Sequence, residues 1–161
     1  MSTTLVGMTE PNWLDDEEFR AWIGYRRMRL LLDAQIARDL SRDSNLSMAD
    51  YDVLSALSAE PDHRRRLNGL ADRMLWSKSR LSRHIGRMEE RGLVARTDSP
   101  DDGRGADVVL TALGLRTLEQ AAPDHVASVR RHFVDLLSRP EILALGNIAE
   151  KTLTHLPGES P

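Results

Sequence analysis

The stretch SKSRLSRHIGRMEERG, residues 77–92, constrains the fold of this chain more than any other segment. Leu81, Ile85 and Met88 recur at helical spacing, so the pattern predicts an amphipathic helix. Ser77 is a typical N-cap residue and Gly92 a typical residue for ending a helix. We expect the opposite, outward face to carry basic and hydroxyl side chains: Lys78, Ser79, Arg80, Ser82, Arg83, His84 and Arg87.

A β-hairpin is predicted directly after this helix. Residues 93–96 and 106–110 are short runs of strand-forming residues, and the intervening sequence SPDDGRG is rich in turn-forming Pro, Asp and Gly. The turn contains Asp102, Gly103, Arg104 and Gly105. The two glycines let the backbone turn and approach a partner, and Asp102 is expected to orient an arginine. Arg104 would project from the tip, although a lone surface arginine is usually only solvated.

A second short helix is predicted before the basic one. Residues 67–74 form a helical pattern with Leu70, Ala71 and Met74 inward, and a brief turn at 75–76 follows. Two short helices joined by a tight turn, the second of them basic, are typical of the helix-turn-helix. With the hairpin added, the pattern predicts a winged helix-turn-helix. Arg104 would then enter the minor groove beside the recognition helix.

The charge of the chain is distributed unevenly. Residues 63–104 contain eleven basic and six acidic side chains, a balance of +5, although the whole chain carries −3. The rest of the chain therefore carries −8. A basic middle between acidic ends is typical of a phosphate-binding module, whereas a solvated helix face is the simpler alternative.

Composition excludes several kinds of chemistry. The chain has 161 residues, 40% of them apolar, and no cysteine, which excludes disulfides, Cys-ligated zinc and thiol-based sensing. There is no apolar run long enough for a membrane span, and the sequence MSTTLVGMTEPNW lacks the features of a signal peptide, so we expect a cytoplasmic protein. Because the common nucleophile, phosphate-loop and metal-ligand motifs are also missing, we expect neither an enzyme nor a cofactor.

The segments that flank the basic middle are predicted to be helical. Residues 15–41 have apolar side chains on more than one face, which favours pairing with a second copy. Ser47 and Asp50 form a capping box for a helix that ends near Ala59. A helix over 111–137 is expected to kink at Pro123, and Ser138, Pro140 and Glu141 begin a last helix. The predicted organisation is a flexible segment 1–14, dimerisation helices 15–45 and 111–156, a DNA-binding domain 46–110 and a disordered tail 157–161.

Three motifs resemble those of the multiple-antibiotic-resistance regulators, the MarR family. They are SKSRLSRHIGRMEERGLVAR, the following SPDDGRG, and VLTALG, which look like the recognition helix, the wing and the start of the fifth helix. The resemblance implies a mainly α fold and a homodimer whose terminal helices interlock. It also implies a repressor, less often an activator, that binds a pseudo-palindromic operator and is often released by a small aromatic or phenolic ligand. The missing cysteine argues against peroxide sensing through a thiol.

The DNA contacts are expected on the basic helix. We expect Lys78, Arg80, Ser82 and Arg83 to reach base edges, where long donors and short hydroxyls read the major groove. Ser77, Ser79, His84 and Arg87 are expected nearer phosphate. The sequence leaves open whether residues 64–66, three consecutive arginines, contact phosphate or are solvated.

Aromatic and histidine residues suggest ligand sites. Trp22 and Tyr25, with Trp13 and Trp76, could line an aromatic pocket, although packing is the commoner role of such side chains. His125 and His132 lie two helical turns apart, roughly 10 Å, so one zinc ion could not bind both without other ligands. We expect them to contact the interface or to pair with Asp124 or Asp135. Two alternatives stay open: a winged helix that binds a protein partner, and a metal-responsive regulator that uses histidines.

Overall fold

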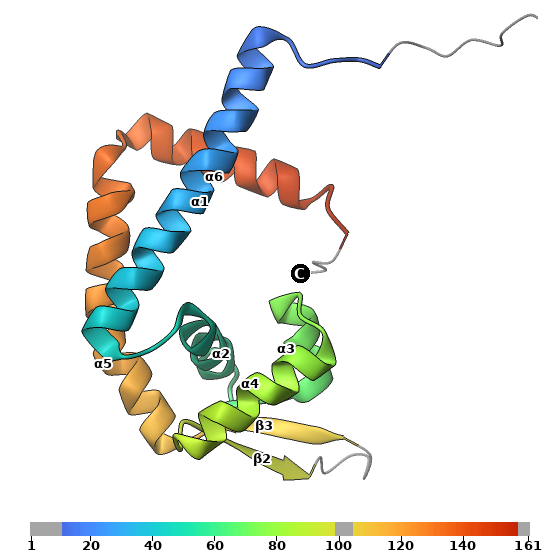
Figure 1. Ribbon diagram of the computed structural model, residues 1–161, viewed down its shortest axis with the longest axis vertical. Helices are drawn as coiled ribbons and strands as arrows, with labels where there is room; N and C mark the ends of the chain where they lie inside the picture. The colour runs from blue at the N-terminus through green and yellow to red at the C-terminus, as the bar shows by residue number, and fades with distance from the viewer. Residues whose placement is uncertain (1–10, 99–104, 158–161) are drawn as a thin grey trace, which may run out of the picture. The chain divides into compact units, whose positions relative to one another are not determined.

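The computed structural model describes residues 11–98 and 105–157, and this part of the chain is mainly helical (Figure 1). Its elements in chain order are α1 (Asp16–Ser44), α2 (Met48–Ser58), β1 (Arg64–Arg66), α3 (Leu67–Met74), α4 (Lys78–Glu90), β2 (Val94–Asp98), β3 (Ala106–Leu110), α5 (Ala112–His132), the 3₁₀ helix η1 (Val134–Leu136) and α6 (Arg139–Leu153). The predicted fold class, a winged helix-turn-helix between long flanking helices, is confirmed.

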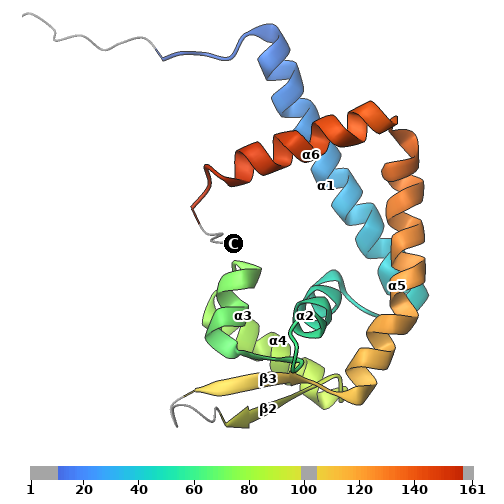
Figure 2. The same ribbon diagram turned by 180° about the vertical axis from the view of Figure 1, so that it is seen from behind.

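The chain divides into two compact units within α1. The first is Met1–Ala34 and the second is Gln35–Pro161. In the second unit α2, α3 and α4 pack together on one side of the small sheet (Figures 1 and 2). The core of this unit includes Leu54, Leu57, Leu70, Leu81, Ile85, Met88 and Val108, all fully buried. The faces of α3 and α4 that were predicted to point inward are therefore buried in the middle of each helix, as expected.

Helix ends in the second unit follow the local sequence signals. Ser47 and Asp50 form the predicted capping box, in which each side chain accepts a hydrogen bond from the other residue's backbone N–H. Gly92 ends α4 with φ +71°, and the N–H groups of Gly92 and Leu93 donate to the carbonyls of Glu89 and Met88. This is a Schellman motif, and it needs the left-handed backbone that glycine adopts readily.

The sheet has the strand order β1-β3-β2, with both pairs antiparallel. In the hairpin, Val94 pairs with Leu110 and Asp98 pairs with Ala106. β1 adds a third strand by pairing Arg65 with Val108, which the sequence indicated only as a short extended piece. The pairing of β1 with β3 therefore joins the segment before α3 to the hairpin after α4. The sheet thus connects the two ends of the segment that contains α3 and α4.

α5 begins against the hairpin. Thr111 Oγ1 accepts the N–H of Gly114 and lies within hydrogen-bond distance of the Gly92 and Leu93 carbonyls. A Cβ atom on Gly114 would lie 2.0 Å from the Leu93 carbonyl oxygen, so only glycine fits this approach. Pro123 lies inside α5 without ending it. The helix ends at His132 and not near Leu137 as expected, because a 3₁₀ turn takes over at Val134.

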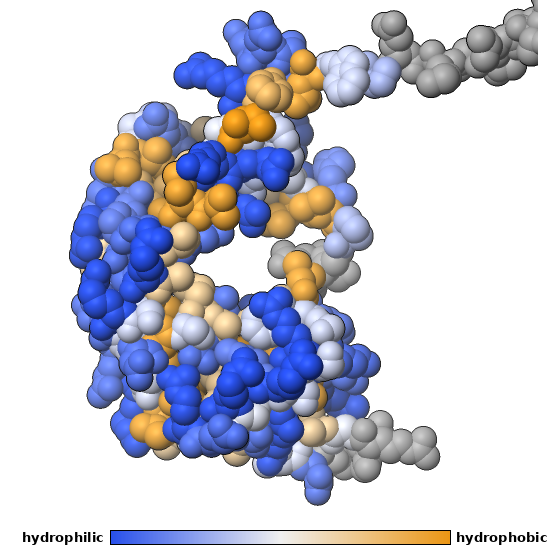
Figure 3. Space-filling view, in the orientation of Figure 1, coloured by the Kyte–Doolittle hydropathy of each residue, from blue (hydrophilic) through white to orange (hydrophobic). Residues whose placement is uncertain are grey.

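Large apolar side chains are exposed on both flanking segments. In the first unit they are Phe19, Trp22, Ile23, Tyr25, Met28, Leu30 and Leu31, and Figure 3 shows apolar surface there. α6, in the second unit, begins with the predicted capping box of Ser138 and Glu141 and buries none of its residues. Its segment exposes Leu143, Ile148, Leu153 and Leu156.

Candidate nucleic-acid interface

The two faces of α4 differ sharply. Its apolar face is fully buried through Leu81, Ile85 and Met88. The opposite face exposes Lys78, Ser79, Arg80, Arg83 and Arg87. Ser77 caps the helix by accepting the N–H of Arg80 at 3.3 Å. The core thus fixes the helix, and its outward side remains available to a partner.

Lys78 and Arg83 are the free cations of this face. Within residues 11–98 and 105–157, neither forms an ion pair or a side-chain hydrogen bond. A surface arginine or lysine without a carboxylate neighbour keeps its whole charge available to a phosphate or a base edge. These two side chains can therefore meet an anionic partner without first breaking an internal contact.

Arg80 is ordered by an aromatic neighbour. Its guanidinium carbon lies 3.9 Å from the centroid of the Trp76 ring. Trp76 is the last residue but one before α4 and is half-buried. A guanidinium over an indole face is the favourable cation–π arrangement. The sequence predicted Arg80 on the outward face and did not predict this contact.

The prediction that His84 lies on the outward face is wrong. The residue is only 7% exposed, because it lies on the same side of α4 as Leu81 and Met88. Its Nε2 is 3.1 Å from Asp50 Oδ1, and its ring meets the Trp76 ring edge-on, with centroids 5.5 Å apart. His84 is therefore not placed to contact phosphate, and it packs between α2 and the turn before α4.

Arg87 determines the form of the His84 ring. Its Nη2 lies 3.0 Å from His84 Nδ1, and a guanidinium can only donate, so Nδ1 must accept. The proton of the neutral ring is then on Nε2, facing Asp50. Burial lowers the pKa of His84, against the opposing effect of the Asp50 charge. Burial and the neighbouring guanidinium of Arg87 favour the neutral imidazole and outweigh the Asp50 charge, which favours the protonated form.

Asp50 connects the start of α2 to two points on α4. Besides its capping role it faces His84, and Arg91 Nη1 donates to its Oδ2 at 2.8 Å. Arg91 also donates to the Asn45 carbonyl. Burial raises the pKa of Asp50, but hydrogen bonds from Arg91 and Ser47 outweigh it, and the pKa lies below its ordinary value. Sequence analysis found only the cap, because the contacts with α4 join residues far apart in the chain.

The hairpin is held to α4 by Arg96. Its backbone N–H and Nε contact the Glu89 carboxylate, at 2.8 and 3.3 Å, and its Nη2 donates to the Ser82 carbonyl. Ser82 is half-buried, and its contact with Arg96 joins α4 to the hairpin. Arg96 therefore orients the hairpin relative to α4.

Two of the three consecutive arginines are engaged within the protein. Arg64 lies 3.5 Å from Asp107 and donates to Thr97 Oγ1, and Arg65 lies 3.1 Å from Glu60. Both are half-buried. The structure thus gives Arg64 and Arg65 a role in attaching β1 to its neighbours, a reading that the sequence did not offer.

The tip of the wing lies largely outside the described residues. Asp102, Gly103 and Arg104 fall in the 99–104 gap, so their predicted roles stay predictions. Gly105 is described and half-buried, and a Cβ atom there would meet open space. β2 ends at Asp98 and β3 begins at Ala106, and their antiparallel pairing agrees with the predicted hairpin.

The histidines of α5 have other partners than predicted. His132 Nε2 lies 2.9 Å from Asp39 Oδ2, which also accepts from the buried Ser128 at 2.7 Å. The bond from Ser128 is the main cause that holds the pKa of Asp39 far below its ordinary value, with His132 and Arg42 adding to it. The expectation that His132 pairs with Asp124 or Asp135 is wrong, because its partner is Asp39. The contacts of Asp39 with His132 and Ser128 tie α5 to the last turns of α1.

The other histidine of α5 contacts an aromatic ring at a tilt of 40°. The His125 ring lies against the Tyr51 ring of α2, with centroids 4.3 Å apart, and its Nδ1 is buried without a hydrogen-bond partner. In the described part of the chain, no three His, Asp or Glu side chains are grouped as metal ligands would be.

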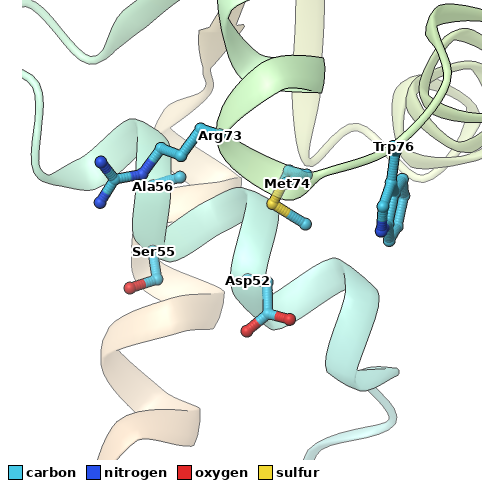
Figure 4. Close-up of a pocket in the computed structure, with 6 residues that line it drawn as sticks. All are labelled: Asp52, Ser55, Ala56, Arg73, Met74 and Trp76. Atoms are coloured by element: carbon cyan, nitrogen blue, oxygen red, sulfur yellow. The ribbon is translucent and has the colours of Figure 1, made fainter. Parts of the chain in front are cut away.

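Aromatic residues occur at two separate places. Trp22 and Tyr25 stack on each other in the first unit, with centroids 6.1 Å apart, and both are half-exposed. In the second unit a cavity of about 340 Å³ opens between α2 and α3. Figure 4 shows its lining residues, which are Asp52, Ser55, Ala56, Arg73, Met74 and Trp76.

No described helix is long and apolar enough to cross a lipid bilayer.

A helix-turn-helix closed by a three-stranded sheet, with a basic outer helix, defines the winged helix-turn-helix class. Known proteins place the chain within that class. The sequence model described as MarR family matches residues 44–105. The chain is 32% identical over 117 residues to the transcriptional regulator HosA of Escherichia coli O111:H-, covering 73% of this chain and 84% of that protein.

Two solved structures from Streptomyces coelicolor agree over nearly the whole chain. AbsC, a MarR family transcriptional regulator, is 41% identical with a TM-score of 0.85, covering 92% of this chain and all of that one. Sco3205, a MarR family regulator solved in complex with DNA, is 35% identical with a TM-score of 0.86, covering 92% of both chains. The chain belongs to the MarR family of transcriptional regulators, as its sequence motifs predicted.

Proposed function

We propose that this regulator binds double-stranded DNA by placing α4 in the major groove. The observation that carries the proposal is the outward face of α4, where Lys78 and Arg83 are exposed and form no ion pair with the described residues, while the opposite face is fixed in the core. The solved complex of Sco3205 with DNA supports the same partner here. A recognition helix presents its first two turns to base edges, and these two cations lie in those turns.

The contacts divide into base and phosphate contacts. Lys78, Arg80, Ser82 and Arg83 are assigned to base edges, where long donors suit guanine. Ser77, Ser79 and Arg87 are assigned to phosphate, and Arg104 to the minor groove beside the hairpin. His84 is not assigned to DNA because it is buried. It supports α4 from its inward side.

The regulator is proposed to act as a homodimer and a repressor. The segments 15–45 and 111–156 are assigned to dimerisation, because both expose large apolar side chains that a second copy could cover. Two recognition helices would then meet successive major grooves of a pseudo-palindromic operator, about 34 Å apart. As a repressor it would bind this operator in the cytoplasm, the location expected from the sequence.

Release by a small molecule is the last part of the proposal. The cavity between α2 and α3 combines the indole of Trp76 with the Arg73 guanidinium and the Asp52 carboxyl, which suits a planar ligand with an acidic or phenolic group. Burial raises the pKa of Asp52, which favours the neutral carboxyl, the form that can donate a hydrogen bond to a ligand. A ligand that prefers one conformation of the dimer shifts it away from the operator.

The decisive experiment measures DNA binding directly. DNA fragments selected from a random pool by the purified protein define the operator, and affinity is then measured against salt. Binding should weaken steeply with salt, and Arg83→Ala should cost about 1 to 3 kcal/mol. Arg131→Ala is the matched control, because Arg131 is exposed near the end of α5 and is not among the residues assigned to DNA contact, and sedimentation checks that this variant stays dimeric. Equal affinities of the two variants would contradict the proposed use of α4.

The alternative is a winged helix that binds a protein partner. It predicts no selected DNA sequence and little dependence of any DNA binding on salt. The same selection experiment therefore separates the two functions. Neither function assigns a catalytic role to any residue of the chain.

A further inference from the structure

The contact between Trp76 and Arg80 has a geometry that bears on base recognition. The Arg80 guanidinium carbon lies over the indole, 3.9 Å from the ring centroid, while the His84 ring approaches the same indole edge-on at an interplanar angle of 88°. The indole thus contacts both the exposed Arg80 side chain and the buried His84 side chain. Arg80 belongs to the first turn of α4, where a docked helix meets base edges.

The backbone before α4 fixes the position of the indole. Leu75 has φ +54°, in the left-handed region, although its side chain is 83% exposed. The N–H groups of Leu75 and Trp76 donate to the carbonyls of Asp72 and Ala71. A leucine in this conformation is strained, so the surrounding hydrogen bonds and the packing of Trp76 must hold the turn. The ring position is therefore a property of the folded turn, and it does not depend on DNA.

A cation–π contact with the indole leaves the N–H donors of the guanidinium free to bind a base. A cation–π contact occupies the flat face of the group, whereas its five N–H donors point outward in the plane. Those in-plane donors form the bidentate pair with O6 and N7 of guanine. An unstacked arginine would also lose rotamer freedom when it bound a base, and a stacked one has lost part of that freedom already.

We propose that Trp76 is a positioning residue, which holds the Arg80 guanidinium in the orientation that reads a base in the major groove. The inference rests on the proposed function, since it needs α4 in that groove. The inference also gives Arg80 a different role from Lys78 and Arg83, which have no cation–π contact among the described residues. The base read by Arg80 should accordingly be the most strictly selected position of the half-site.

A double-mutant cycle tests the inference on the DNA fragment that the wild-type protein selects. Trp76→Leu should weaken specific binding by roughly fivefold, the value expected for a cation–π contact of about 1 kcal/mol. In an Arg80→Ala background the same change should have no further effect. In an Arg83→Ala background, the matched control, it should keep its full effect.

Trp76→Phe keeps an aromatic face, so it should retain most of the affinity and the same selected base. If Trp76→Leu does not fold, as judged by circular dichroism, Trp76→Phe and Trp76→Met replace it in the cycle. Equal losses from the indole substitution with and without Arg80 would overturn the inference, because Trp76 would then act through the fold or by touching DNA. Failure of the proposed function would differ, since the wild-type protein would then select no DNA.

Discussion

Asp50 and His84 face each other between α2 and α4, with the Asp50 Oδ1 atom 3.1 Å from the His84 Nε2 atom. Asp50 also closes the capping box of α2 and accepts a hydrogen bond from Arg91 at the end of α4. One buried carboxylate thus holds the start of one helix against the middle and the end of the recognition helix. The orientation of the basic face depends on this contact as much as on the apolar core.

Replacing Asp50 with alanine should destabilise the protein strongly. The change removes the cap of α2 and leaves His84 and Arg91 without their carboxylate partner. Together these losses should lower the free energy of unfolding by about 2 to 4 kcal/mol, measured by urea titration. Asp43→Ala is the control, because it removes an exposed ion pair with Arg42 and should cost less than about 1 kcal/mol. Similar losses in both variants would show that the buried contacts of Asp50 contribute nothing.

Acid should destabilise the protein through His84. Burial lowers the pKa of His84 below the ordinary 6.5, so the unfolded chain takes up a proton first as pH falls. Stability from the neutral ring is therefore complete above about pH 6.5 and is lost as pH falls toward the lowered pKa, by at most about 1.4 kcal/mol per pH unit. His84→Gln should make unfolding less dependent on pH between 7.5 and 5.5.

His125 contributes to the same pH dependence. Burial also lowers the pKa of His125, so a smaller slope of the same sign should persist in His84→Gln. A profile that His84→Gln does not alter would mean that the histidine is not held neutral in the folded protein.

Gly114 should tolerate no side chain. A Cβ atom there would lie 2.0 Å from the Leu93 carbonyl oxygen, a backbone atom that cannot move without disturbing the hairpin. Gly114→Ala should therefore cost at least about 2 kcal/mol in thermal or urea unfolding. Gly69→Ala, inside α3 with its nearest neighbour at 3.8 Å, should instead stabilise by about 0.5 to 1 kcal/mol. The opposite signs make the pair of variants a direct test of the α5 contact.

Dimerisation should fail when the exposed apolar surface of α6 becomes charged. Ile148 is 61% exposed in the chain and would be covered by a second copy. We expect Ile148→Asp to sediment as a single chain at concentrations where the wild-type protein sediments as a dimer, and to bind the operator at least tenfold more weakly. Ala59→Glu, at the exposed end of α2, is the control and should remain dimeric. A wild-type protein that sediments as a single chain would contradict the assignment of these helices.

Local signals in the sequence predicted most of the elements. The caps at Ser47, Ser77 and Ser138 and the stop at Gly92 act over a few residues, so the helices that they bound could be placed from the chain alone. α3 was predicted with both of its ends correct. β1 was harder to predict, because a three-residue strand exists only through its pairing with β3.

His84 shows how a polar residue can be misplaced. Its spacing from Leu81 and Met88 is that of the buried face, and the signal for burial was therefore present in the sequence. A polar side chain is buried here beside two charged neighbours: Arg87 donates to Nδ1, and Asp50 Oδ1 lies 3.1 Å from Nε2.

The sequence by itself determined the helices and the hairpin, the basic character of residues 63–104 and the family of the chain, because these depend on local pattern and composition. Tertiary structure alone decided which charged residues are free to meet DNA. Arg96 is engaged with Glu89, and Arg80 lies over an indole, while Arg83 contacts no carboxylate in the part of the chain that the structure describes. Charge is a property of each residue, whereas its availability depends on neighbours that only folding brings within a few ångströms.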